Sequence, residues 1–295
     1  MEEKMRITDA MLAGRVVDSI NDSKSRLGDL QNILSTGKKI NKPSDDPLNI
    51  SSAFNLRKEL QEINQYLRNG ETATSWIDVT TSTLTQVSEV LNSARTIALR
   101  ESNATATFES RSASAQEVRN LKRQLLNLAN TSFNGKYIFS GTKTLTRPFT
   151  DDGVYQGDEG EIKIQIEDRQ TITVNAPGDK IFQGEEDIFS VLSDLEEALN
   201  NGDTGAISSQ IGKLDSCLNQ IHRWEGEFGG RGKRVEIFKS RLKDQEVGLT
   251  KLLSAIEDAD VTKTITDLQH AGAAYQAALY AGREILRYTL IDFWR

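Results

Sequence analysis

The chain has 295 residues, and its 43 acidic against 36 basic side chains give a formal net charge of −7. This acidic balance argues against nucleic acid as a partner, because such binding rests on clustered Lys and Arg. No apolar run approaches the roughly 20 residues that cross a bilayer, so we expect no membrane insertion. Aromatic residues make up 6 % and hydrophobic residues 37 % of the chain, which is typical of long helices with narrow apolar stripes.

Both ends of the chain carry apolar or small residues at alternating steps of four and three. This repeat predicts helices that pack along one side against another helix. Small alanines flank the C-terminal stripe and favour its burial between molecules. The stripe positions are Ile20, Leu27 and Leu34 at the head, and Val261, Ile265, Leu268, Gly272, Tyr275, Leu279, Gly282 and Leu286 at the tail.

The first half of the chain is expected to be helical. A first helix over about 8–35 precedes a loop in which Ser44, Asp45 or Asp46 can cap the next helix, with Pro47 in its first turn. That second helix is predicted from 48 to about 101, since no proline interrupts it. A third helix is predicted over about 107–131.

The periodicity then changes to that of strands. Asn134-Gly135 is a hairpin signal within 133–141, followed by the apolar residues Tyr137 and Phe139. Apolar residues alternate at Ile162, Ile164 and Ile166 and again at Ile172 and Val174, with a polar turn at 168–170. The alternation predicts two strands, each with one buried face.

Helix resumes at about 187–200 and again from about 204 to 257. Gly229-Gly230-Arg231-Gly232 interrupts the second of these, at about 1 kcal/mol per glycine relative to alanine. Phe228 and Val235 keep the heptad phase across it, which predicts a strained but continuous helix or a local bend.

These patterns predict a mainly α fold of long antiparallel helical rods, a coiled-coil bundle with paired N- and C-terminal helices and a small β-hairpin-rich insertion in the middle. The chain returns on itself, so that the head lies beside the tail. The expected segments are an N-terminal helix (1–41), an outgoing arm with a hairpin at 133–141 (42–147), a β-rich insertion (148–184), a returning arm (185–257) and a C-terminal helix (258–295).

No arrangement of residues indicates catalysis. Cys217 and His222 are five apart, whereas two metal ligands on one helix face are three or four apart. The Asp45-Asp46 pair fits helix capping better than acid–base chemistry. We expect no catalytic residue, no metal and no cofactor, and therefore no enzyme.

Several motifs resemble the flagellin superfamily. They are Met5-Arg6-Ile7-Thr8, the stretch 34–40, the loop of Pro43, Ser44, Asp45, Asp46 and Pro47, the stretch 134–142, and 256–260 with 267–269, 275–279 and 290–293. Four pieces resemble the superfamily's hook–filament junction members more than its filament flagellins: the Arg6-Ile7-Thr8 start, the Pro-Ser-Asp-Asp-Pro loop, Pro148-Phe149 and 178–182. The four residues before Met5 and the ending Phe293-Trp294-Arg295 depart from the pattern.

The resemblance implies a structural subunit of the bacterial flagellum, exported unfolded through the flagellar type III apparatus and placed outside the cell at the hook–filament junction. It implies polymerisation through the terminal helices into a ring or helical homo-oligomer. The implied partners are the first hook-associated junction protein, flagellin, and an export chaperone on the C-terminal region. A filament flagellin is the closest alternative, and a cytosolic helical signalling protein is an alternative from another class.

Overall fold

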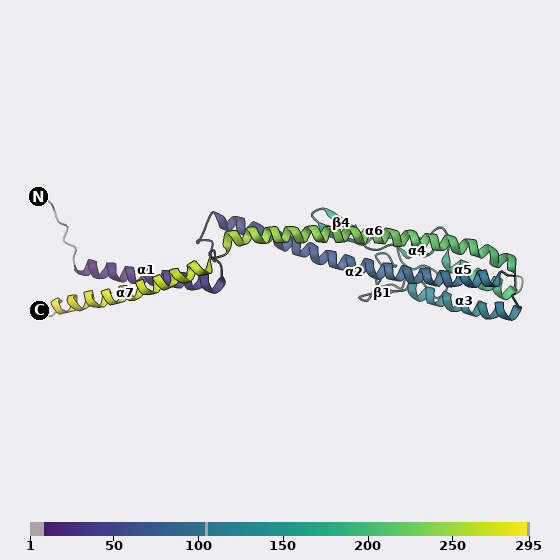
Figure 1. Ribbon diagram of the computed structural model, residues 1–295, viewed down its shortest axis with the longest axis horizontal. Helices are drawn as coiled ribbons and strands as arrows, with labels where there is room; N and C mark the ends of the chain where they lie inside the picture. Colours follow the sequence, from purple (N-terminus) through teal and green to yellow (C-terminus); the bar gives the residue numbers. More distant parts are fainter. Residues whose placement is uncertain (1–8, 104–105, 294–295) are drawn as a thin grey trace. The chain divides into compact units, whose positions relative to one another are not determined.

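The computed structural model describes residues 9–103 and 106–293, so the Met5-Arg6-Ile7-Thr8 motif and the last two residues lie outside it. The described chain is mainly α-helical, with two short β-hairpins between long helices (Figure 1), and the predicted fold class is confirmed. In order, the elements are α1 (Asp9–Thr36), α2 (Asn49–Glu101), α3 (Phe108–Ala129), β1 (Ser132–Phe133), β2 (Lys136–Tyr137), β3 (Lys163–Glu167), β4 (Gln170–Thr173), α4 (Gly178–Phe182), α5 (Ile188–Asn201), α6 (Thr204–Glu257) and α7 (Val261–Phe293).

The chain divides into two compact units. Unit 1 comprises residues 1–61 and 247–295, and unit 2 comprises residues 62–246. Helices α2 and α6 therefore each contribute residues to both units. In unit 1, α1 packs against α7, so that segments from opposite ends of the chain lie side by side (Figure 1).

Short polar side chains fix where the helices begin. The Oδ1 of Asp46 accepts hydrogen bonds from the backbone N–H groups of Leu48 and Asn49 at the start of α2. Asp187, Asp203 and Asp260 do the same ahead of α5, α6 and α7, and Thr107 does so ahead of α3. Each cap satisfies donors that have no partner within the helix.

Unit 2 is a helical bundle built on the long helices α2 and α6, with α3 packed against α5. Its hydrophobic cluster takes fully buried side chains from all four helices, among them Leu84, Leu125, Leu195 and Leu214. The loops between α3 and α5 extend this core with aromatic rings: the Phe149 ring lies 5.4 Å from that of Phe182 and 5.1 Å from that of Phe189. These rings form an aromatic part of the core that the low aromatic content of the sequence did not predict.

Both predicted hairpins are present. β1 pairs with β2 across Asn134 and Gly135, whose φ angles of 50° and 75° are those of a type I′ turn. β3 pairs with β4, with Ile164 opposite Ile172. The first hairpin is shorter than predicted, because the chain leaves it after Tyr137 and the Phe139 carbonyl accepts instead from the backbone N–H of Gly178, 2.8 Å away.

One element was not predicted. Residues 178–182, placed by the sequence in the β-rich insertion, form the short helix α4. Pro177 precedes it in an extended conformation, and Ile181 and Phe182 are fully buried. A single turn is too short to show a helical period in the sequence, which is why the pattern missed it.

The glycine-rich stretch 229–232 lies inside one continuous helix, α6. Phe228 and Val235 are both fully buried in the core of unit 2. Their burial offsets the low helix propensity of the glycines, as their heptad spacing predicted.

Candidate assembly site

Helices α1 and α7 run antiparallel within unit 1. Gly272 of α7 faces Leu27 of α1, and a Cβ placed at Gly272 would lie 3.9 Å from Leu27 Cδ1. Ten residues further along α7, a Cβ at Gly282 would lie 3.0 Å from Ile20 Cδ1 and 3.1 Å from Val16 Cγ1. Two glycines of α7 thus lie at its contact with α1.

The residues of α7 that face α1 form a stripe of small and medium side chains, which we call the inner face. Ala271 and Gly282 are buried and Leu268 and Tyr275 are half-buried. The predicted head residues Ile20, Leu27 and Leu34 are also half-buried. These predicted assembly residues therefore lie at the contact between the two terminal helices of one chain.

Other predicted assembly residues of the same stripe are exposed, and together with the neighbouring Tyr280 we call them the outer face of α7. Val261 is 51 % exposed, Ile265 42 % and Leu279 44 %, and Tyr280 beside them is 73 % exposed. The side chain of Leu286 lies outside the part that the structure describes. Helix α7 thus carries apolar side chains that the packing within the described chain leaves exposed.

The junction of α6 with α7 holds a buried carboxylate that the sequence did not single out. Glu257 is 3 % exposed, and its Oε1 accepts a hydrogen bond of 2.6 Å from the Nζ of Lys38. Its Oε2 accepts from the guanidinium of Arg57 on α2. The Glu257 carbonyl also accepts from the backbone N–H of Lys39 at 2.7 Å. One residue thereby joins the segment after α1, the first part of α2 and the end of α6.

The loop motif folds around its two aspartates. Asp45 Oδ2 accepts from the backbone N–H groups of Lys42 (2.7 Å) and Asn41 (2.9 Å), and these bonds hold the pKa of its carboxyl below the usual value. Asp46 caps α2, and its hydrogen bonds from the Asn49 side chain and backbone lower the pKa of its carboxyl as well. Pro43, Ser44 and Pro47 lie in the turns around them. The loop residues thus fix the start of α2 in unit 1.

The hairpin motif belongs to unit 2 instead. Asn134 and Gly135 make the β1–β2 turn, and the backbone N–H of Tyr137 donates to the Thr144 carbonyl over 2.8 Å. Phe139 is fully buried, with its ring 5.2 Å from that of Phe182. These residues serve the core of unit 2 rather than the terminal helices.

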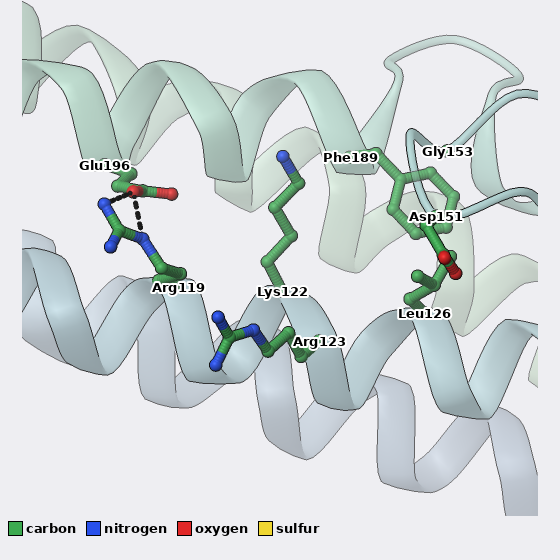
Figure 2. A pocket seen from close by; sticks show the side chains of 8 residues that line it. All are labelled: Arg119, Lys122, Arg123, Leu126, Asp151, Gly153, Phe189 and Glu196. Carbon is green, nitrogen blue, oxygen red and sulfur yellow. Dashed lines mark hydrogen bonds and ion pairs between the residues drawn. The ribbon is translucent and has the colours of Figure 1, made fainter.

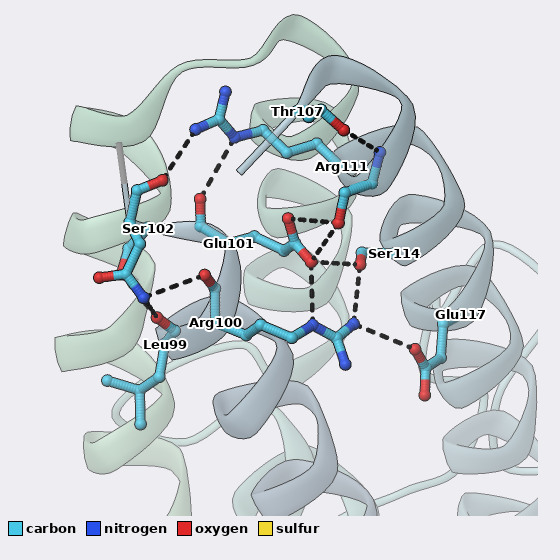
Figure 3. A network of polar contacts seen from close by, with 10 residues as sticks. Leu99, Arg100, Glu101, Ser102, Thr107, Arg111, Ser114 and Glu117 are labelled. Atoms are coloured by element: carbon cyan, nitrogen blue, oxygen red, sulfur yellow. Dashed lines mark hydrogen bonds and ion pairs between the residues drawn. The ribbon is translucent and has the colours of Figure 1, made fainter. Parts of the chain in front are cut away.

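Sequence reasoning also missed a buried polar network at the end of α2 (Figure 3). Glu101 is fully buried, and its carboxylate accepts from Arg100 Nε (2.9 Å), Ser110 Oγ (3.0 Å) and Ser114 Oγ (2.9 Å). Burial by itself would raise the pKa of Glu101, but these hydrogen bonds outweigh it and lower the pKa below its ordinary value. The sequence does contain a signal for this network: two serines spaced four apart lie on α3, and a Glu lies at the end of α2.

The potential metal ligands Cys217 and His222 have different surroundings. Cys217 is buried, and burial raises the pKa of its thiol to about 12, whereas His222 Nε2 lies 3.3 Å from Ser88 Oγ. Within residues 9–103 and 106–293, no group of three or more His, Cys, Asp and Glu side chains could hold a metal ion. No described helix is both long and apolar enough to cross a membrane.

Comparison with known proteins agrees with this architecture. Residues 7–144 match the bacterial flagellin N-terminal helical region. Flagellar hook-associated protein 3 of Escherichia coli is 29 % identical over 303 residues, which cover 94 % of this chain and 96 % of that protein. The chain is therefore similar to flagellar proteins along most of its length.

Solved structures of FlgL proteins share the fold. FlgL of Bacillus cereus is 25 % identical, with a TM-score of 0.61 over 68 % of this chain and 99 % of that one. The flagellar junction protein FlgL of Legionella pneumophila is 17 % identical, with a TM-score of 0.60 over 72 % of this chain and 100 % of that one. The resemblance seen in the sequence motifs is confirmed.

Proposed function

We propose that this chain is a structural subunit of the bacterial flagellum that contributes to the hook–filament junction. The observation that carries the proposal is the end-to-end likeness to hook-associated protein 3, which extends over 94 % of the chain and so includes both terminal helices. A structural role needs surfaces that other subunits cover, and the outer face of α7 is such a surface.

In the proposed assembly, copies of the chain polymerise through the terminal segments 1–41 and 258–295 into a ring or helical array. The arms 42–147 and 185–257, with the β-rich insertion 148–184, form the next layer outward. The first hook-associated protein lies on one side of the array and flagellin on the other. Polymerisation buries the outer face of α7 in each copy.

The proposal includes export before assembly. The chain travels unfolded through the flagellar type III apparatus, and a chaperone covers the C-terminal region beforehand. The apolar outer face supports this, because Val261, Ile265, Leu279 and Tyr280 would otherwise promote aggregation in the cytosol. Replacing Leu279 and Tyr280 by serine is expected to lower chaperone binding in a pull-down from the host cytosol.

Deletion of the gene in its flagellated host tests the junction role. We expect hooks to remain, filaments to be absent, and flagellin to accumulate in the medium, with all three restored by the full gene on a plasmid. Normal filaments in the deletion strain would exclude the role. Loss of the filament subunit itself, with the junction still present, would assign the chain to the filament flagellins instead.

A further inference from the structure

A hollow of about 250 Å³ lies in unit 2 between α3, α5 and the turn at 151–153 (Figure 2). Arg119, Lys122 and Arg123 line it from α3, at spacings that bring them to one side of the helix. Leu126 continues this side of α3, and the Phe189 ring from α5 faces it. The hollow thus combines three cations with an apolar end.

Two of the three cations have no acid bound to them. Arg119 forms an ion pair with Glu196, with 2.6 Å between its Nη2 and Oε1 of Glu196. Lys122 donates to the hydroxyl of Ser193 over 2.6 Å, which leaves its charge uncompensated. Arg123 is exposed, and the described contacts include no ion pair for it. Positive charge is therefore available in the hollow.

The acids nearby limit the charge of a ligand. Asp151 also lines the hollow, although the guanidinium of Arg147 binds it at 2.8 Å. With Asp151 and Glu196 in the wall, a doubly charged phosphate would meet two carboxylates. A singly charged carboxylate suits the available cations better, and an arginine fork matches its geometry.

The apolar end fits the stem of an acidic side chain. Phe189 is 4 % exposed, and Gly153 lies over its ring with a φ of +81°. A Cβ at Gly153 would come within 3.2 Å of Phe189 Cγ, so any side chain there would press on the ring and narrow the hollow. The methylene groups of a Glu can lie against the half-buried Leu126 while its carboxylate reaches Lys122 and Arg123.

We propose that this hollow receives an Asp or Glu side chain from a neighbouring copy of the same chain. The inference rests on the proposed function, which places copies side by side. Charge complementarity supports it: another copy carries 43 acidic against 36 basic residues, so its acidic side chains are in excess, whereas basic side chains outnumber acidic ones in the lining of the hollow. The contact would fix the lateral register of neighbouring copies, separately from the terminal helices.

The test uses the full chain in assembled flagella, with the photo-cross-linking residue p-benzoylphenylalanine at Asp152. Asp152 is exposed beside Gly153 at the edge of the hollow. Irradiation is expected to give a dimer of this chain, and mass spectrometry should map the link beside an Asp or Glu. The double variant Lys122→Glu/Arg123→Glu should reduce the dimer about tenfold. The matched control Arg169→Glu, at a side chain that is 92 % exposed on the β3–β4 turn, should not.

The outcomes separate this inference from the proposed function. Flagella that contain the chain but give no dimer, or a link to another flagellar protein, overturn the inference and leave the junction role standing. Absence of the chain from flagella overturns both. Titration of the purified chain with propionate tests a free small molecule as the ligand. Saturable binding at Arg123 without a dimer in flagella would assign the hollow to a free carboxylate and overturn the inference. Thermal unfolding confirms that each variant is folded.

Discussion

The Nζ of Lys38 lies 2.6 Å from Oε1 of Glu257, although 219 positions separate the two residues in the chain. Because Arg57 binds the other carboxylate oxygen, Glu257→Gln would leave two cations without their acid. We expect a loss of about 2 kcal/mol in unit 1, less than for a wholly buried pair because both cations are partly exposed. Faster amide hydrogen exchange at 37–61 and 247–260 would report this loss of stability.

The control for that experiment is Glu236→Gln, which removes an exposed pair with Lys233. Such pairs contribute little, so exchange should be unchanged. Equal exchange in the Glu257 variant and the parent would show that the ion pairs do not stabilise the joint.

The second prediction concerns pH. The folded-state pKa of Glu101 lies below the ordinary pKa of a glutamate. Its contribution to stability is therefore present above the ordinary pKa and is lost as the pH falls through the folded pKa. We expect Glu101→Gln to lower the unfolding free energy of unit 2 by about 2 kcal/mol at pH 7. The difference from the parent should shrink toward pH 3, measured by urea unfolding at a series of pH values. A difference independent of pH would refute the role of the charge.

The third prediction concerns the contact of α1 with α7. Gly282→Leu places atoms where Ile20 and Val16 already lie, and overpacking of this kind costs about 1–3 kcal/mol. Gly272→Ala meets only an ordinary contact at 3.9 Å and gains up to about 1 kcal/mol of helix propensity. The thermal unfolding midpoint of the purified chain, followed by its helix content, should fall for Gly282→Leu and rise for Gly272→Ala. The same direction for both would contradict close packing at Gly282.

The fourth prediction separates the two faces of α7. Leu279 is 44 % exposed in the single chain, so Leu279→Glu should change the unfolding free energy by less than about 0.5 kcal/mol. In the proposed polymer that side chain is buried, and the variant should be absent from purified flagella. Gln269→Glu, at another exposed position of α7, is the control and should be incorporated normally. Normal incorporation of the Leu279 variant would exclude the outer face as an assembly surface.

The fifth prediction concerns Arg231, which donates from the middle of α6 to the carbonyls of Thr173 (3.2 Å) and Asn175 (2.9 Å). Arg231→Ala removes both bonds and should cost about 1–3 kcal/mol, since partly buried carbonyls lose a charged donor. Amide exchange in β3 and β4 should accelerate, while Lys233→Ala, at an exposed side chain, should leave it unchanged. Unaltered exchange in both variants would show that other contacts hold the hairpin.

The long helices and both hairpins could be predicted because their periods extend over many residues and their turns have specific chemistry. Asn134-Gly135 is an example, since few other pairs adopt two positive φ angles. The continuity of α6 through 229–232 followed from the phase of Phe228 and Val235. Signals of this kind are local and repeat along the chain.

How much of the α7 stripe α1 covers could not be predicted in the same way. The pattern placed Gly282 in one stripe with Val261 and Leu279, yet Gly282 is buried and the other two residues are exposed. A repeat in one helix does not reveal how much of that helix its partner covers. The role of Glu257 was missed for a related reason, because its partners Lys38 and Arg57 come near it only in the folded chain.

The backbone bonds at 37–39 and 257–259 also bear on the order of folding. Lys39 donates to the Glu257 carbonyl and Ala259 to the Gly37 carbonyl. Unit 1 can therefore close only when about the last sixth of the polypeptide is available, and its closure costs the chain entropy of a very large loop. Contacts between residues so far apart in sequence form late, so a nascent molecule has its first segment available and unpaired. Completion of the chain is thus the event that permits its two ends to meet.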